Sequence, residues 1–284
     1  MKLKNILTAA AVLAVALGAM AAGLADAQAA SDSPDKEAAF GDGEQLTYVV
    51  SYRAALVPNL EAGEVNIRTT ATTVDGVAAY NIHGNAKVFS HFKWVYDLDD
   101  TYQTWLDQKT LKPLKYDYRI REGKYRVNAN YSYDWANNQV HTYYHNLKRE
   151  TGKSRTLKLS DNSFDALALF SNFRSQDMSG YAVGRTGTIK LVLQDTIRTL
   201  QFKYLGKEQY TVKKLGTFNT LKFSCTIATS DGERFEDGSE FFLWLTDDKN
   251  KMPIYLESPV KVGSVRVVMT KYSGLKYPLT SKIK

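Results

Sequence analysis

The amino-acid sequence predicts an all-β, mainly antiparallel fold in which a large curved sheet forms an open β-barrel or β-roll with one short central helix. Three observations support this class. Apolar and polar residues alternate along many short segments, aromatic residues make up 12% of the 284 residues, and 18 residues are Tyr. Alternation at period two buries one face of a strand, and aromatic residues favour sheets. A content of 44% hydrophobic and 24% charged residues excludes disordered and collagen-like chains.

The N-terminus has the three parts of a secretory signal peptide. A basic start is followed by an apolar stretch over residues 6–22 and by a small-x-small motif over residues 25–27. We therefore expect a signal peptide over residues 1–27 and a periplasmic mature protein, in preference to an extracellular one. No later segment approaches the roughly 18 consecutive apolar residues of a membrane helix. We expect no membrane span after cleavage.

Residues 28–39 carry no large apolar side chain. They have nothing to bury that would offset the entropy lost on ordering, so we expect a flexible leader. The rest of the chain, residues 40–284, is predicted to form the β domain. Its length allows one large domain or two lobes, 40–160 and 185–284, joined by a helix.

The clearest strand begins at Tyr125, where aromatic and apolar residues alternate with polar ones as far as Trp135. Segments 46–52 and 116–120 repeat this pattern, so each strand has one bulky face and one polar face. Turn-forming Gly, Asn and Asp residues separate the alternating segments at 75–76, 122–124, 136–138, 231–232 and 247–250. Because such connections are short, neighbouring strands should be antiparallel.

One segment, residues 161–174, has a helical period instead. Phe164, Leu167, Phe170 and Phe173 recur at helical spacing after a group of capping residues. We expect a helix of about three turns here, as a plug or a connector between two β-rich halves. Residues 90–96 are a weaker helical candidate.

No pattern in the sequence assigns a metal site. His141 and His145 would stand roughly 13 Å apart on a strand with a rise of ~3.3 Å per residue, too far to share one ion. Residues 161–165 match the first positions of a calcium loop, but Ala166 and Asn172 stand where Gly and Glu are required. A helix N-cap explains the same residues, so we assign no metal.

Catalysis is also unassigned. Acidic residues at 97–100 and 247–248 could form the carboxyl pair of a sugar hydrolase, but adjacent strand residues point to opposite faces. The chain has no Gly-x-Ser-x-Gly motif, phosphate loop or dinucleotide fingerprint. We therefore assign no catalytic residue and no cofactor. Binding is favoured over catalysis, and an envelope hydrolase is the enzymatic alternative.

The aromatic residues indicate a binding surface. Tyr116, Tyr118, Tyr131, Tyr133 and Trp135 lie on the bulky faces of two neighbouring predicted strands. Core packing is the alternative interpretation, because Tyr in sheets usually serves it. Aromatic surface beyond the needs of the core would line a groove for an apolar or glycan ligand. The net charge of +7 favours an anionic partner, and export argues against nucleic acid.

Short motifs also stand in a defined order along the chain. They are Phe40-x-x-Gly43-Glu44-x-Leu46-x-Tyr48, Asp107-x-x-Thr110-Leu111-x-Pro113, Asp165-x-Leu167 with Arg174, Trp244-Leu245-Thr246-Asp247-Asp248-x-Asn250-x-x-Pro253, Lys261-Val262-Gly263-Ser264-Val265, Tyr272-x-Gly274-Leu275 and Pro278. This order resembles the domain of unknown function 3108 family of exported bacterial proteins, in a form common in Bacteroidetes. The resemblance implies a secreted all-β envelope protein and supplies no functional residue.

These observations predict a periplasmic protein that binds a hydrophobic or amphipathic envelope molecule in a concave aromatic face. A lipid, a lipopolysaccharide-like molecule or a glycan would fit this description. The alternative is a structural or protein-interaction component of the cell envelope, whose protein partner the sequence does not identify.

Overall fold

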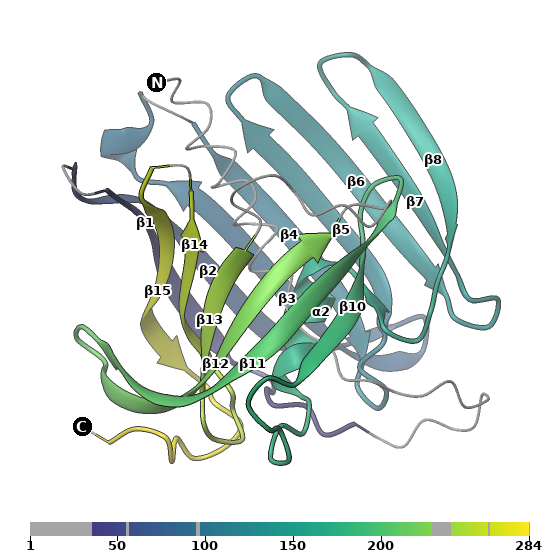
Figure 1. The fold of residues 1–284 in the computed structure, drawn as a ribbon. Helices are drawn as coiled ribbons and strands as arrows, with labels where there is room; N and C mark the ends of the chain where they lie inside the picture. The colour runs from purple at the N-terminus through teal and green to yellow at the C-terminus, as the bar shows by residue number, and fades with distance from the viewer. Residues whose placement is uncertain (1–35, 55–56, 95–96, 229–239, 261, 284) are drawn as a thin grey trace.

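The computed structural model describes residues 36–54, 57–94, 97–228, 240–260 and 262–283. These residues form one sheet of 15 strands and one α-helix (Figure 1). The expected all-β class with one helix is confirmed. The predicted signal peptide, residues 1–27, and the turn at 231–232 lie outside the described residues.

The first half of the chain forms eight strands that follow one another as hairpins. They are β1 (Gln45–Ala54), β2 (Val57–Val74), β3 (Val77–Val88), β4 (Asp99–Asp107), β5 (Pro113–Glu122), β6 (Tyr125–Asp134), β7 (Gln139–Asn146) and β8 (Thr151–Lys158). Each pairs antiparallel with its neighbours in sequence. Between β3 and β4, the weaker helical candidate 90–96 contains the single 3₁₀ turn η1 (Ser90–Phe92), and its residues 95–96 lie outside the described residues.

The second half adds the helix and seven more strands. They are β9 (Ser163–Phe164), α2 (Ala166–Arg174), β10 (Thr186–Val192), β11 (Ile197–Val212), β12 (Gly216–Ala228), β13 (Glu240–Thr246), β14 (Pro253–Pro259) and β15 (Ser264–Ser273). Strands β10 to β15 are again antiparallel neighbours, and β9 adds to β10 in parallel.

The two halves form one continuous sheet because β1 pairs with β15. The sheet begins at the edge strand β8 and ends at β9. Only residues 159–162 connect these edges, so the sheet must curve back on itself. The Leu159 amide donates to the Asn138 carbonyl at 2.8 Å, and the Lys190 amide donates to the Asn162 carbonyl at 3.0 Å. The result is an open barrel whose one continuous sheet includes strands from both of the ranges 40–160 and 185–284.

Helix α2 lies inside the curve of the sheet (Figure 1), and all nine of its residues are buried. It begins at Ala166, later than the predicted 161–174 helix, because Ser163 and Phe164 pair with β10 instead. Asp165 is the N-cap, and its carboxylate accepts from the Ala168 amide at 2.9 Å. In the described part of the chain, no helix has the length and apolar character needed to cross a membrane.

A buried ion pair fixes the C-terminal end of α2. Arg174 is 1% exposed and Glu44 is 2% exposed. The guanidinium donates to both carboxylate oxygens of Glu44 at 2.7 and 2.8 Å, and to the Asn250 carbonyl at 3.1 and 3.0 Å. Burying such charges is tolerated only when they are paired and hydrogen-bonded. Residues of three separate sequence motifs therefore meet here in a structural role.

The last residues of the predicted 28–39 leader belong to the fold. The Lys36 amide donates to the Lys109 carbonyl at 2.7 Å, and the Ala39 amide donates to Ser175 Oγ at 3.1 Å. Ala38 and Ala39 are each 3% exposed. Small side chains fill a close contact here, which corrects the expectation that only large apolar residues could order this segment.

Candidate functional site

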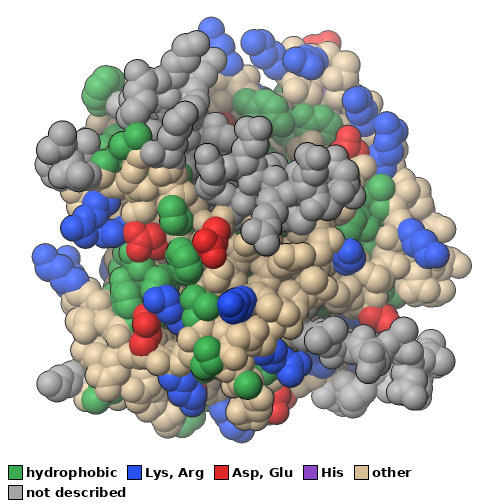
Figure 2. Space-filling model, viewed as in Figure 1, with side chains coloured by type: hydrophobic (Ala, Val, Ile, Leu, Met, Phe, Trp, Pro, Cys, Tyr) green, Lys and Arg blue, Asp and Glu red, His purple; other side chains and the backbone are tan. Residues whose placement is uncertain are grey.

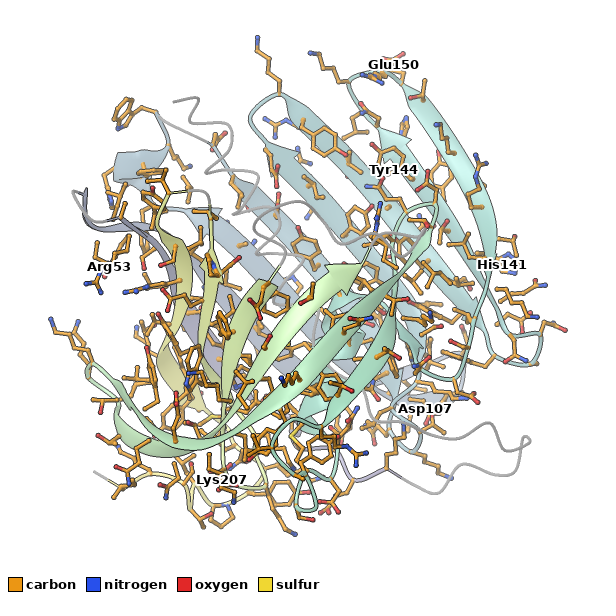
Figure 3. All side chains as sticks on the ribbon, in the orientation of Figure 1. Arg53, Asp107, His141, Tyr144, Glu150 and Lys207 are labelled. Atoms are coloured by element: carbon orange, nitrogen blue, oxygen red, sulfur yellow. The ribbon has the colours of Figure 1, made fainter. Side chains whose placement is uncertain are left out.

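The inner face of β4–β8 is built from rows of directly paired residues, which lie on the same side of a sheet. One row is Thr104, Tyr116, Tyr131, Thr142 and Arg155, and the next is Tyr102, Tyr118, Ala129, Tyr144 and Lys153. Odd-numbered residues of β7 point the other way. Figure 3 labels Tyr144 and His141, which lie on opposite sides of this strand.

A cavity of about 320 Å³ lies between this inner face and the turn that joins β10 to β11. It is lined by Tyr102, Tyr116, Tyr118, Ile120, Tyr131, Ala166, Val192, Leu193, Gln194, Asp195, Thr196 and Arg198. We call Tyr102, Tyr116, Tyr118 and Tyr131 the tyrosine wall. The volume is at the lower end of the roughly 300–1,000 Å³ of small-molecule sites.

The two sides of the cavity differ in polarity. On one side the rings of the tyrosine wall pack against each other, with centroids 5.2 Å apart for Tyr116 and Tyr131 and 6.0 Å apart for Tyr118 and Tyr131. On the other side the turn contributes polar side chains, among them Gln194 and Thr196. One side of the cavity is therefore aromatic and the other side is polar, and this arrangement suits an amphipathic molecule.

Burial moves the pKa of each tyrosine of the wall further above physiological pH. It raises the pKa of Tyr102, Tyr116 and Tyr131 well above the usual value for a phenol. Burial also raises the pKa of Tyr118, and a hydrogen bond from Gln194 partly offsets this shift. These hydroxyls are therefore neutral donors and acceptors at physiological pH.

A carboxyl group adjoins the tyrosine wall. Asp100 is fully buried, and burial raises its pKa to about 7. The Tyr102 hydroxyl donates to its Oδ2 at 3.2 Å, and the Arg121 amide donates to its Oδ1 at 2.8 Å. Asp100 therefore fixes the position of the Tyr102 ring at the cavity.

The turn is held over the cavity by β7, the strand next to the edge strand β8. Thr142 Oγ1 on β7 donates to the Gln194 carbonyl at 2.7 Å. This bond joins the two halves of the barrel where their strands are not paired, so the turn forms one side of the cavity.

Three of the five predicted site residues meet at the cavity: Tyr116, Tyr118 and Tyr131. The other two, Tyr133 and Trp135, do not line the cavity. The Tyr133 hydroxyl donates to Asp165 Oδ2 at 3.3 Å, while Trp135 stacks on Tyr133 and donates to the Pro113 carbonyl at 2.7 Å. Whether any of the five binds a ligand stays a prediction.

Asp165 explains why Tyr133 is not at the cavity. Its carboxyl accepts from Thr104 Oγ1 at 2.9 Å as well as from Tyr133 and the helix. Burial raises the pKa of Asp165 to about 7. The group thus links β4, β6 and α2.

The sequence prediction missed Tyr102 and the whole β10–β11 turn. Tyr102 lies in a segment that forms a strand, so the alternation of its residues could have identified Tyr102 as part of the inner face. No local signal distinguishes the turn, because only closure of the barrel brings it to the tyrosine wall.

Three other acidic candidates from the sequence have partners within the fold. Asp99 pairs with Lys87 at 3.4 Å and Asp247 pairs with Lys207 at 2.7 Å. Asp248 accepts from the Asn250 amide at 3.0 Å and from Ser281 Oγ at 2.6 Å. Within the described ranges, no three His, Cys, Asp or Glu side chains form a group that could hold a metal ion.

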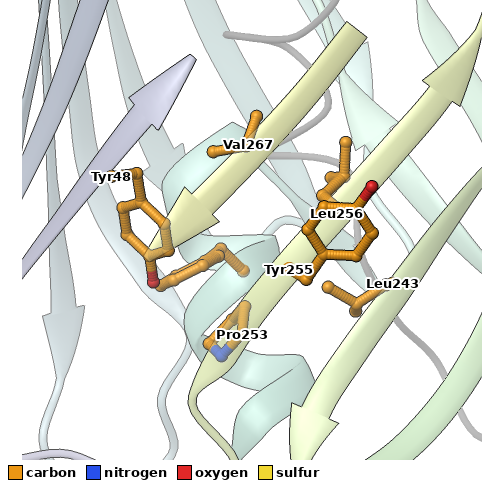
Figure 4. A pocket seen from close by; sticks show the side chains of 7 residues that line it. Tyr48, Leu243, Pro253, Tyr255, Leu256 and Val267 are labelled. Atoms are coloured by element: carbon orange, nitrogen blue, oxygen red, sulfur yellow. The ribbon is translucent and has the colours of Figure 1, made fainter. Parts of the chain in front are cut away.

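A second space, of about 10 Å³, lies beside Tyr48 (Figure 4). It is lined by Tyr48, Phe170, Leu243, Pro253, Tyr255, Leu256 and Val267. The Tyr48 hydroxyl is the one buried side-chain polar group in the described residues without a hydrogen-bond partner. This space has room for about one water molecule, so it is not a ligand site.

Comparison with known proteins gives the fold and the family. No curated protein matches the sequence. The chain is similar to a crystal structure of a β-barrel-like protein of domain of unknown function DUF1849 from Brucella abortus, with a TM-score of 0.56 and 10% identity over 83% of this chain and 99% of that one. That likeness shows the fold alone. The family model described as a protein of unknown function, DUF3108, matches residues 47–270, and the chain therefore belongs to the DUF3108 family.

Proposed function

We propose that this protein binds an amphipathic molecule of the cell envelope in the cavity at the tyrosine wall and catalyses no reaction. The cavity itself carries the proposal, because it places three aromatic residues predicted as a binding face around one space of about 320 Å³. The predicted signal peptide supports a periplasmic location, where lipids, lipopolysaccharide-like molecules and glycans are available.

The chemistry of the lining supports an amphipathic ligand. Ring faces and aliphatic groups such as Ile120 and Val192 would contact an apolar part, while Gln194 and Thr196 would hydrogen-bond a polar part. The neutral hydroxyls of the tyrosine wall would orient the ligand by hydrogen bonds without adding charge. This combination fits a binding protein better than a glycoside hydrolase, which needs two carboxyl groups across its substrate.

The second candidate is a protein-interaction role, and β8 favours it. Seven of the eight β8 residues are exposed, and β8 forms one edge of the sheet. The unpaired backbone groups of an edge strand can add a strand from a partner. Crosslinking from β8 that captures one specific protein, without any ligand in the cavity, would support this alternative.

The binding proposal is tested by native mass spectrometry of protein purified from the periplasm. Ala166 lines the cavity, so Ala166→Leu should fill part of it and remove the copurified ligand. Tyr143 is 40% exposed on the outer side of β7, and Tyr143→Leu is the matched control, which should keep the ligand. The proposal fails if the natural protein carries no ligand and binds no added amphiphile, or if Ala166→Leu retains the ligand as the control does.

A further inference from the structure

The concave face continues past the cavity to two basic side chains on β8. Arg155 is in the row of Tyr131 and Thr142, and Lys153 is in the row of Ala129 and Tyr144. Directly paired residues share a face, and the Thr142 side chain points inward to Gln194. Lys153 and Arg155 therefore project from the inner side of the edge strand.

These two residues lie close to the cavity. Arg155 is two strands from Tyr131 in the same row, which corresponds to about 10 Å at the usual strand spacing. Thr142, the residue between them, also holds the β10–β11 turn. The basic side chains thus border the opening where the sheet is not closed.

Aromatic surface connects the cavity to Lys153. Tyr144 separates Ala129 from Lys153 in one row, and its hydroxyl is 3.1 Å from that of Tyr125. Tyr125 is 41% exposed. An extended molecule could therefore lie along these rings between the cavity and β8.

The two basic groups have no carboxylate partner among the described residues. Other Lys side chains of this half do, such as Lys87 with Asp99, Lys112 with Asp161 and Lys115 with Asp75. Lys153 and Arg155 are exposed, and Arg155 donates to the Ser154 carbonyl at 3.1 Å. Figure 2 shows Lys and Arg side chains along the rim over β5–β8. Cations gathered at the mouth of a cavity attract anions.

We propose that the ligand of this cavity is an anionic amphiphile, with its apolar part at the tyrosine wall and its acidic head against Lys153 and Arg155. This inference rests on the proposed function and names its ligand class. On the turn side, Asp195 and Arg198 both line the cavity, so their opposite charges offset each other. Lys153 and Arg155 add two positive charges at β8, so the head would lie against β8 and not against the turn. Charged side chains on an edge strand also prevent it from pairing with other chains. Charges on either face of the strand could serve that purpose, whereas contact with a ligand in the cavity requires charges on the inner face.

The test is fluorescence titration of the full mature protein with a fluorescent dodecanoic acid and with its methyl ester. The double variant Lys153→Gln/Arg155→Gln should weaken binding of the acid about fivefold, which corresponds to about 1 kcal/mol for the two exposed charge contacts together. Binding of the ester should be unchanged. The matched control, Lys148→Gln/Lys158→Gln, removes the same charge from the β7–β8 turn and from the outer side of β8, and should bind the acid normally. Competition by dodecyl phosphate, compared with inorganic phosphate, distinguishes a lipid from a free anion.

The outcomes separate the two proposals. Equal affinity for acid and ester in the natural protein, or full acid binding by the double variant, overturns the anionic head while cavity binding stands. Self-association of the double variant in sedimentation, with acid affinity retained, shows that the charges only protect the edge and also overturns it. No binding of either probe rejects the proposed function itself.

Discussion

Two walls of the same barrel use aromatic residues differently. The tyrosine wall of β4–β6 faces a cavity, whereas Phe202 on β11 and Phe223 on β12 face solid core. Phe173 of α2 packs against both, with ring centroids 5.7 and 4.9 Å away. Phe223 is fully buried and Phe202 is 2% exposed. We call Phe202 and Phe223 the phenylalanine wall.

The difference comes from the hydroxyl group, which Tyr carries and Phe lacks. A buried Tyr hydroxyl needs a hydrogen-bond partner, and an apolar helix surface offers none. Phe has no such requirement and can pack directly against α2. The helix therefore fills the barrel against the phenylalanine wall, while the tyrosine wall faces a space whose other side is the polar β10–β11 turn.

The largest effect should come from truncating one ring in each wall. Phe223→Ala leaves a cavity in close-packed core and should lower the free energy of unfolding by about 3–5 kcal/mol. Tyr118→Ala borders space that already exists, so little new cavity forms and the loss should be about 2 kcal/mol or less. Urea denaturation measures both. Equal losses would show that the two walls are packed alike.

A pH effect should follow from the carboxyl group of Asp165, which links β4 and β6 to α2. Burial raises the pKa of Asp165 to about 7, above the value of about 3.9 in an unfolded chain. The folded state then binds the proton more tightly, so stability falls as pH rises from about 4 to about 7. The slope is at most about 1.4 kcal/mol per pH unit for one group.

Asp165→Asn tests this origin, because Asn keeps the N-cap acceptor but cannot ionise. Denaturation at several pH values should show a smaller fall in stability for the variant. Part of the fall should remain, since burial also raises the pKa of Asp100 to about 7. A pH dependence identical to that of the natural protein would contradict the assignment.

The smallest effect should come from Tyr48, whose ring is packed in the core as a Phe ring would be. Tyr48 is 1% exposed and its hydroxyl has no partner. Tyr48→Phe removes this unsatisfied group and should raise the free energy of unfolding by about 1 kcal/mol. Tyr118→Phe is the control, because its hydroxyl bonds Gln194, and it should bring no gain. A destabilised Tyr48→Phe variant would mean that the hydroxyl has a partner in solution.

The sequence predicted the strands well where alternation was strong. The segment from Tyr125 to Trp135 corresponds to β6, which spans Tyr125–Asp134. The helix was expected from residue 161 but begins at Ala166, because pairing with β10 takes Ser163 and Phe164. A local helical period cannot reveal this competition, since β10 lies more than 20 residues later in the chain.

The candidate site was predicted only in part, for a similar reason. Alternation identified Tyr116, Tyr118 and Tyr131 but also Tyr133 and Trp135, which share their face and not their surroundings. Which ring meets open space depends on where α2 begins and where the β10–β11 turn crosses. Neither is encoded near the aromatic residues themselves.

The sequence by itself therefore determined which faces of the strands are apolar, where most hairpins turn and that one helix interrupts the strands. Side-chain period and turn chemistry are local properties that act over a few residues. Only the tertiary structure decided that β1 pairs with β15, that Arg174 meets Glu44 across 130 residues, and that a cavity remains beside the tyrosine wall. Those features depend on the packing of the whole curved sheet around α2, which no short segment specifies.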